Sequence, residues 1–208
     1  GMKNGIHVLC LIFLSACAKP ESGVVSTSGA LRNIMQKGEI GPQIALSDIS
    51  SRDGLYALGA ISQLKGEITI FDGTPSIATV VDNAVFINDD TNVEAALLVY
   101  SQVDSWEKMK AIPVSHGIAA VDSVLSDLLR LRADGKALPF LLRGTADKLD
   151  WHVIDWDPND SDHTHANHKS SGVNGTIRNT PVAILGFYSE KHHGVFTHHT
   201  RNIHMHFK

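Results

Sequence analysis

Apolar residues recur at helical spacing in one long stretch of the chain, residues 115–132. Positions three and four residues apart carry Val121, Val124, Leu125, Leu128 and Leu129. This spacing places them on one face of an α-helix, and Asp134-Gly135 is a typical end signal. The stretch therefore predicts one main helix whose apolar face packs on a core.

Short apolar or alternating runs, typical of β-strands, dominate the rest of the chain. They lie at residues 55–59, 67–71, 77–81, 84–88, 95–100, 140–143, 150–156 and 182–188. Asp72-Gly73 and Asp82-Asn83 predict two-residue hairpin turns between neighbouring strands, and residues 29–36 predict a short helix. The expected fold class is mixed α/β (α+β), with largely antiparallel sheets and one main helix. We expect a single domain over residues 29–208.

The last predicted strand carries two histidines on one face. His204 and His206 alternate with Ile203, Met205 and Phe207. Because alternate side chains of a strand point to the same side, the two imidazoles can bind one metal ion, with zinc preferred. A histidine-rich tract can also be a solvated loop that binds metal weakly, and this alternative stays open.

The N-terminus predicts export. Lys3 and the apolar run at residues 6–14 are typical of a signal peptide. The run ends in Leu14-Ser-Ala-Cys17, which resembles the lipobox of bacterial lipoproteins, so residues 1–17 predict a signal with Cys17 as the lipid anchor. Residues 18–28 are expected to be a tether. We therefore expect a lipoprotein of the bacterial cell envelope, on the periplasmic side or the cell surface, whose lipid anchor binds the membrane.

Charge and cysteine content limit the kinds of binding partner and covalent link that we expect. A net charge of -4 without a basic stripe argues against nucleic acid and favours a small-molecule ligand. Only Cys10 and Cys17 occur, so no disulfide is expected in the mature protein. The oligomeric state stays open, with a homodimer as one option.

Two separated motifs resemble the bacterial acetolactate decarboxylases. The stretch Gly54-Leu-Tyr-Ala-Leu-Gly-Ala-Ile-Ser-Gln-Leu-Lys-Gly-Glu67, followed by Ile-Thr-Ile-Phe-Asp-Gly73, is similar to their Leu-Asp-Gly-Glu region. Residues 176–207 are similar to their stretch ending in His-Leu-His-Phe. The resemblance implies a zinc ion in a cleft and loss of carbon dioxide from 2-acetolactate, or a related 2-hydroxy-3-oxo carboxylate, to give acetoin. It matches His204 and His206 to two zinc ligands and Glu67 to the carboxylate at the metal.

The sequence departs from this family at two places. A third histidine follows the His-x-His of the family by roughly ten residues, whereas this sequence ends at Lys208. The remaining ligand then comes from elsewhere in the chain or from beyond Lys208. The position of the family's substrate-binding arginine holds His152, for which Arg143 could substitute.

We expect the missing ligand to be His199 or His198, because a short link to the strand limits the entropy of closing the site. The other histidines of this region, His163, His165 and His168, lie among aspartates in a segment expected to be a solvated loop. Three functions remain: a metal-dependent lyase, a zinc hydrolase of small esters with Glu67 as base, and a non-catalytic protein that binds metal or carboxylate at the envelope.

Overall fold

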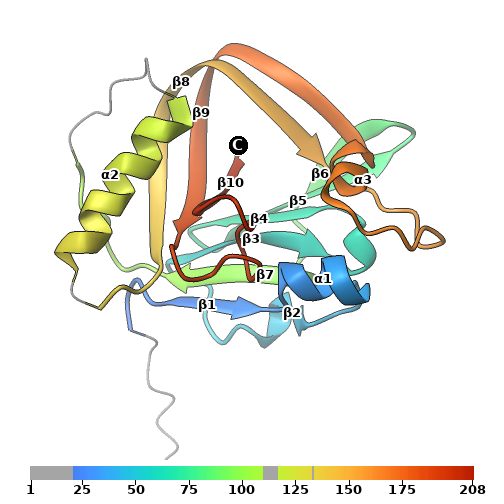
Figure 1. The fold of residues 1–208 in the computed structure, drawn as a ribbon, viewed down its shortest axis with the longest axis horizontal. Coiled ribbons are helices and arrows are strands. Elements are labelled where there is room, and N and C mark those ends of the chain that lie inside the picture. The colour runs from blue at the N-terminus through green and yellow to red at the C-terminus, as the bar shows by residue number, and fades with distance from the viewer. Residues whose placement is uncertain (1–20, 110–116, 133) are drawn as a thin grey trace, which may run out of the picture.

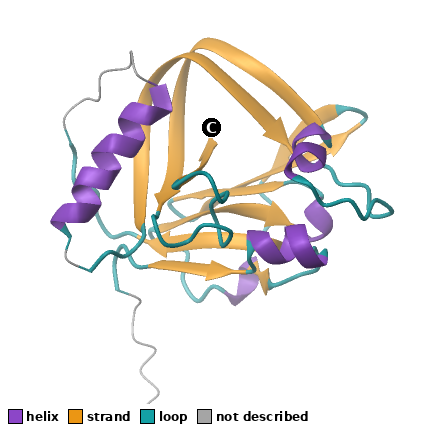
Figure 2. Ribbon diagram, in the orientation of Figure 1, coloured by secondary structure: helices purple, strands orange, loops and turns teal. Residues whose placement is uncertain are grey.

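The computed structural model of the protein describes residues 21–109, 117–132 and 134–208. These residues form two antiparallel sheets with helices at their sides (Figure 1, Figure 2). The predicted fold class is thereby confirmed. The expected signal segment, Cys17 and the first residues of the expected tether lie outside the described residues.

The larger sheet has the order β1-β7-β3-β4-β5-β6, and β2 also pairs with β7. Its strands are β1 (Val25–Ser28), β2 (Ile44–Ala45), β3 (Leu55–Ile61), β4 (Glu67–Phe71), β5 (Thr74–Val81), β6 (Ala84–Asn88) and β7 (Glu94–Gln102). Both predicted hairpin turns are present, and all four of their central residues have positive φ, between 48° and 76°. Aspartate, asparagine and glycine tolerate this left-handed backbone better than other residues.

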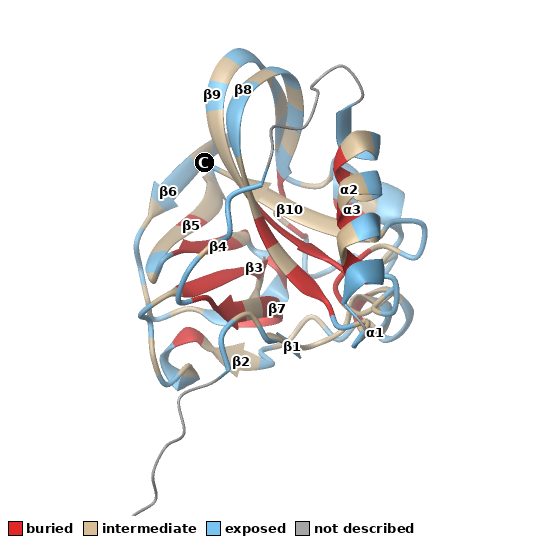
Figure 3. Ribbon diagram, turned by 90° about the vertical axis from the view of Figure 1, so that its left-hand side faces the viewer, coloured by how far each residue is buried: buried red, intermediate tan, exposed pale blue. Residues whose placement is uncertain are grey.

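The smaller sheet has the order β10-β9-β8, with β8 (Leu138–Val153), β9 (Val173–Tyr188) and β10 (Ile203–Phe207). β8 is a single strand of 16 residues, where the sequence indicated two separate runs. It bends over the top of the molecule together with β9, from the side of α2 toward α3 (Figure 1). The middle of β8 is largely exposed and therefore polar (Figure 3). Because it lacks an apolar run, the sequence pattern did not predict that the strand continues through it.

Helix α2 (Gly117–Leu131) covers the outer face of the smaller sheet. Its buried residues Val121, Leu125 and Leu129 pack against Leu138, Phe140 and Tyr188, and the half-buried Ile203 and Met205 join the same cluster. The predicted apolar face of the main helix is thus confirmed as a packing face.

A core cluster joins the two sheets. Leu58, Phe71 and Val99 of the larger sheet pack against Leu185 and Phe187 of β9. All five are buried, and β3, β7 and β9 each carry buried stretches (Figure 3). Burial of such apolar surface between sheets is the main stabilising term of the fold.

Shorter elements complete the chain: α1 (Leu31–Lys37), the 3-10 turns η1 (Leu46–Asp48) and η2 (Ser62–Leu64), and α3 (His165–Ser170). Two of the elements differ from expectation. β1 lies within the expected tether but pairs along its whole length with β7, and α3 lies within the expected solvated loop. In the described part of the chain, no helix is long and apolar enough to span a membrane.

Candidate metal centre

His204 and His206 lie on the face of β10 that points toward the larger sheet. The alternate residues Ile203 and Met205 pack on the α2 side, so strand alternation turns the histidines inward. Their ring centroids are 5.2 Å apart, with planes at 77°. The predicted juxtaposition of the two imidazoles is therefore present.

Backbone carbonyls fix the protonation of both rings. His204 Nδ1 lies 2.8 Å from Phe196 O, and His206 Nδ1 lies 3.0 Å from Ile68 O. A carbonyl oxygen only accepts a hydrogen bond, so each Nδ1 carries the proton and donates it. The Nε2 lone pair of each ring is left free, which is the usual arrangement of a metal-binding histidine.

Thr69 adds a second contact to His206. Its Oγ1 lies 2.9 Å from His206 Nδ1, and the residue is 7% exposed. It shares the inward face of β4 with Glu67, because the two are two residues apart on the strand. Sequence reasoning missed Thr69, although this spacing after Glu67 was a usable signal.

Glu67 places a carboxyl group beside the histidines. Its Oε2 lies 3.6 Å from His206 Nε2, and its Oε1 accepts a hydrogen bond of 3.3 Å from the backbone N–H of Ile154. Burial raises the pKa of Glu67 to about 8, although the bond from Ile154 acts in the opposite direction. The carboxyl is therefore mostly protonated at neutral pH.

The two histidines are neutral under the same conditions. Burial lowers the pKa of His204 to about 4 and that of His206 to about 3. Since the Glu67 carboxyl is also neutral, the contact between Glu67 and His206 is not an ion pair at pH 7. A cation bound here would favour the ionised form of Glu67 and would accept the lone pairs of the two Nε2 atoms.

The donors present fit a metal ion in part. Two free imidazole nitrogens and one carboxyl oxygen are ligands that zinc prefers. No group of three or more His, Cys, Asp or Glu side chains among the described residues is already arranged to hold an ion. Small side-chain movements, or a further ligand, are needed to complete the set.

His152 and Arg143, the two candidates for binding a substrate carboxylate, both lie on β8 and are exposed. The charge of His152 affects the pKa of both His204 and His206, so it lies within electrostatic range of the centre. Partial desolvation, together with Lys169 and His165, lowers the pKa of His152. A neutral His152 gives no positive charge to a carboxylate at pH 7.

The structure brings His198 and His199 together with His165, whose ring lies 4.4 Å from that of His198. No hydrogen bond or ring contact within the described residues joins His198 or His199 to the His204 and His206 pair. A role for either as the third ligand therefore stays a prediction without a contact to support it.

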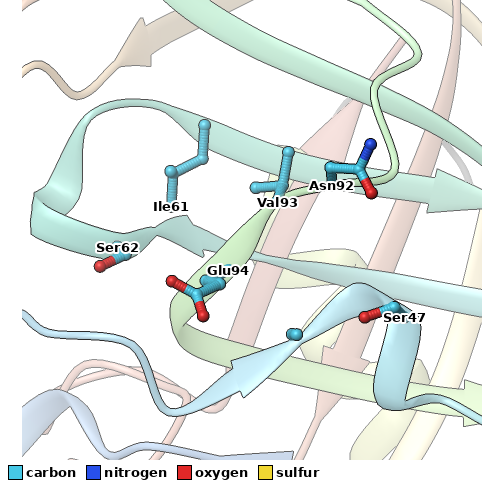
Figure 4. A pocket seen from close by; sticks show the side chains of 7 residues that line it. Ser47, Ile61, Ser62, Asn92, Val93 and Glu94 are labelled. Atoms are coloured by element: carbon cyan, nitrogen blue, oxygen red, sulfur yellow. The ribbon is translucent and has the colours of Figure 1, made fainter.

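A separate hollow of about 470 Å³ lies at the edge of the larger sheet (Figure 4). Its lining includes Ser47, Asn92 and Glu94 but none of the histidines. We therefore place the candidate site at β4 and β10.

Solved structures with this fold include acetolactate decarboxylases and a protein similar to them. Over 88% of this chain, one from Bacillus subtilis strain 168 superposes at a TM-score of 0.64 with 14% identity, covering 74% of that protein. The enzyme from Bacillus subtilis subspecies spizizenii gives 0.65 and 13%, covering 75%. A Staphylococcus aureus protein of unknown function, similar to alpha-acetolactate decarboxylase, gives 0.63 and 15%, also covering 75%.

At the level of sequence, no protein-family profile and no curated protein matches the chain. The structural likeness shows the fold: mixed, mostly antiparallel sheets with few helices, arranged as in acetolactate decarboxylases. At identities of 13–15%, the comparisons show the fold alone, and any catalytic chemistry depends on the residues of the centre.

Proposed function

We propose that the protein is a metal-dependent carboxy-lyase that acts on 2-acetolactate or a related 2-hydroxy-3-oxo acid. The observation that supports this most strongly is the convergence of Glu67 on the inward-facing pair His204 and His206. It occurs in a fold whose solved examples include acetolactate decarboxylases.

The reaction breaks the bond between the carboxylate carbon and C2 of the substrate. The electron pair of that bond passes toward the neighbouring carbonyl as carbon dioxide leaves, and an enediolate remains. One proton delivered to carbon then gives the hydroxyketone. Because burial raises the pKa of Glu67, its carboxylate readily takes up a proton and can relay it from solvent to carbon.

A divalent ion, zinc by preference, would be held by Nε2 of His204, Nε2 of His206 and Glu67. When bound, it would stabilise the negative charge that develops on the substrate oxygens. The Phe196 and Ile68 carbonyls keep both imidazoles in the tautomer that such binding requires.

Acetoin release from 2-acetolactate in the presence of Zn²⁺ tests the proposal. We expect Glu67→Gln to lower the rate by about 10²–10⁴-fold, because a proton-transfer group is lost. Glu94→Gln is the matched control, since Glu94 is an exposed carboxylate in the separate hollow. It should keep the rate of the unmodified protein.

Full activity of the Glu67→Gln variant would reject the role of Glu67. If no variant releases acetoin, hydrolysis of a small ester with zinc present is the next assay. Inactivity in both assays, with metal still bound, would identify a binding protein.

We also propose that the protein is exported and held at the cell envelope through a lipid on Cys17. The support is the Leu14-Ser-Ala-Cys17 motif that follows the apolar run.

A further inference from the structure

Three histidines from two distant segments meet at the surface of the molecule. His165 begins α3, whereas His198 and His199 lie in the connection between β9 and β10. The His165 and His198 ring centroids are 4.4 Å apart, and those of His198 and His199 are 4.1 Å apart. The fold therefore brings His165 beside two histidines that follow it by more than thirty residues in the chain.

We propose that His165, His198 and His199 form a second binding site, at the surface, for a divalent transition metal ion. Imidazole nitrogens suit zinc, copper and nickel, whereas calcium and magnesium require oxygen ligands. The ring contacts include no carboxylate, so the site selects the first group of ions.

The side chains are accessible to an ion in solution. His165 and His199 are exposed, and His198 is half-buried. The positive charge of the nearby Arg201 reduces the attraction of this cluster for a cation.

Thr200 orients the His198 ring. His198 Nδ1 lies 2.9 Å from Thr200 Oγ1 and 3.4 Å from Thr200 N. The backbone N–H of Thr200 donates to Nδ1, so Nε2 carries the ring proton. Nε2 can bind a metal after this proton moves to Nδ1, which can then donate to Thr200 Oγ1. The long contact to the Thr200 backbone would be given up.

A rearrangement of the rings has to accompany binding. The rings are tilted by 48° and 41° against one another, and no three donor groups in the described ranges already meet at one point. Rotation of exposed side chains between rotamers costs little compared with a metal–imidazole bond. The site therefore forms on metal binding.

This cluster is distinct from the centre at β4 and β10. The hydrogen bonds of His204 and His206 go to Phe196, Ile68 and Thr69, and their histidine neighbour outside the pair is His152.

Equilibrium dialysis against micromolar Zn²⁺ tests the second site. Four proteins are compared: the unmodified chain, His204→Ala/His206→Ala, His165→Gln/His198→Gln, and the combination of all four changes. We expect two bound zinc ions for the unmodified chain. Each double variant should bind one, and the combination of all four changes should bind none. Loss of two ligands should weaken binding at the surface cluster by at least about tenfold, since even outer contacts of a metal site contribute that much.

The control is His193→Gln, which removes an exposed histidine that contacts Asn202 instead of the cluster. It should bind as much zinc as the unmodified chain. Circular dichroism checks that each variant is folded. If the His204→Ala/His206→Ala variant fails to fold, Cu²⁺ electron paramagnetic resonance on the otherwise unmodified chain, with and without the His165→Gln/His198→Gln changes, replaces it.

Loss of a nitrogen-coordinated copper signal in the cluster variant supports the site. The proposal would be overturned if the His165→Gln/His198→Gln variant bound as much zinc as the unmodified chain. It would also be overturned if the His193→Gln control lost as much zinc as that variant. If the centre at β4 and β10 binds no metal, the cluster should still bind one ion, so the two proposals fail separately.

Discussion

At the residue scale, the candidate site consists of groups that the sequence could identify and groups that it could not. The His204 and His206 pair followed from alternation along one strand, and Glu67 followed from a motif. The carbonyls of Phe196 and Ile68 could not be predicted, because backbone acceptors leave no trace in residue types. They come from segments that only the tertiary fold brings to β10.

Substitution of His152 by arginine should raise acetolactate turnover. His152 lies within electrostatic range of the centre, but its lowered pKa leaves it neutral at pH 7. A guanidinium stays charged and binds a carboxylate through two parallel hydrogen bonds. Acetoin release by His152→Arg should exceed that of the unmodified protein, with the same change at the exposed His193 as control. A rate at or below the unmodified value would show that His152 does not face the substrate carboxylate.

Acid should destabilise the protein through His168. This side chain is 8% exposed and packs edge-on against Trp156, at 4.6 Å between ring centroids. Burial, with His163 and His165 nearby, lowers its pKa from 6.5 to about 4. Between these values the unfolded chain binds more protons, so the free energy of unfolding falls as pH decreases from 6.5 to 4.

Thermal unfolding at several pH values measures this effect. The midpoint of His168→Gln should fall less steeply over that range than the midpoint of the unmodified protein. His204 and His206 contribute with the same sign, so part of the dependence remains. Parallel curves for the two proteins would contradict the assignment to His168.

At the element scale, local patterns predicted the short hairpins and the main helix well. β4 and β6 begin and end where their alternating runs do, because the turns at Asp72-Gly73 and Asp82-Asn83 fix their ends. Long-range pairing was harder to predict. β1 belongs to the sheet because it pairs with β7, which lies far away in the sequence. β8 continues through a polar stretch because β9 pairs along it.

The close approach of β8, β9 and β10 depends on Gly186. A Cβ at this position would lie 2.1 Å from the ring of Phe140, which is buried. Gly186→Ala should therefore destabilise the protein by about 1–3 kcal/mol, the usual cost of overpacking. Denaturant unfolding measures this, with Gly144→Ala on the same hairpin as control, since nothing lies within 4 Å of its added Cβ. Equal stability of the two variants would contradict the packing argument.

At the scale of the whole molecule, the fold places the two sheets so that an edge strand of one supplies the histidines and an inner strand of the other supplies Glu67. Core residues such as Leu58 and Phe187 hold the sheets together around this centre. A fold depends on the apolar character of its core positions more than on their exact residues, so it can match acetolactate decarboxylases at 13–15% identity.

The proposed anchor makes a prediction about the whole protein in its cell. Cys17→Ser should move the protein from the membrane fraction to the soluble fraction, or leave an unprocessed precursor, because lipid chains hold a protein to a bilayer. Fractionation followed by immunoblotting measures this, with Cys10→Ser as control. Soluble mature protein before any substitution would contradict anchoring.

The central claim is that one metal ion binds between Glu67, His204 and His206. A crystal grown with Zn²⁺ and measured on both sides of the zinc absorption edge tests it most directly. We predict an anomalous peak within bonding distance of Nε2 of both histidines and of a Glu67 oxygen, at about 2.0–2.2 Å. A crystal whose zinc peaks all lie elsewhere, with the two Nε2 atoms free, would contradict the claim.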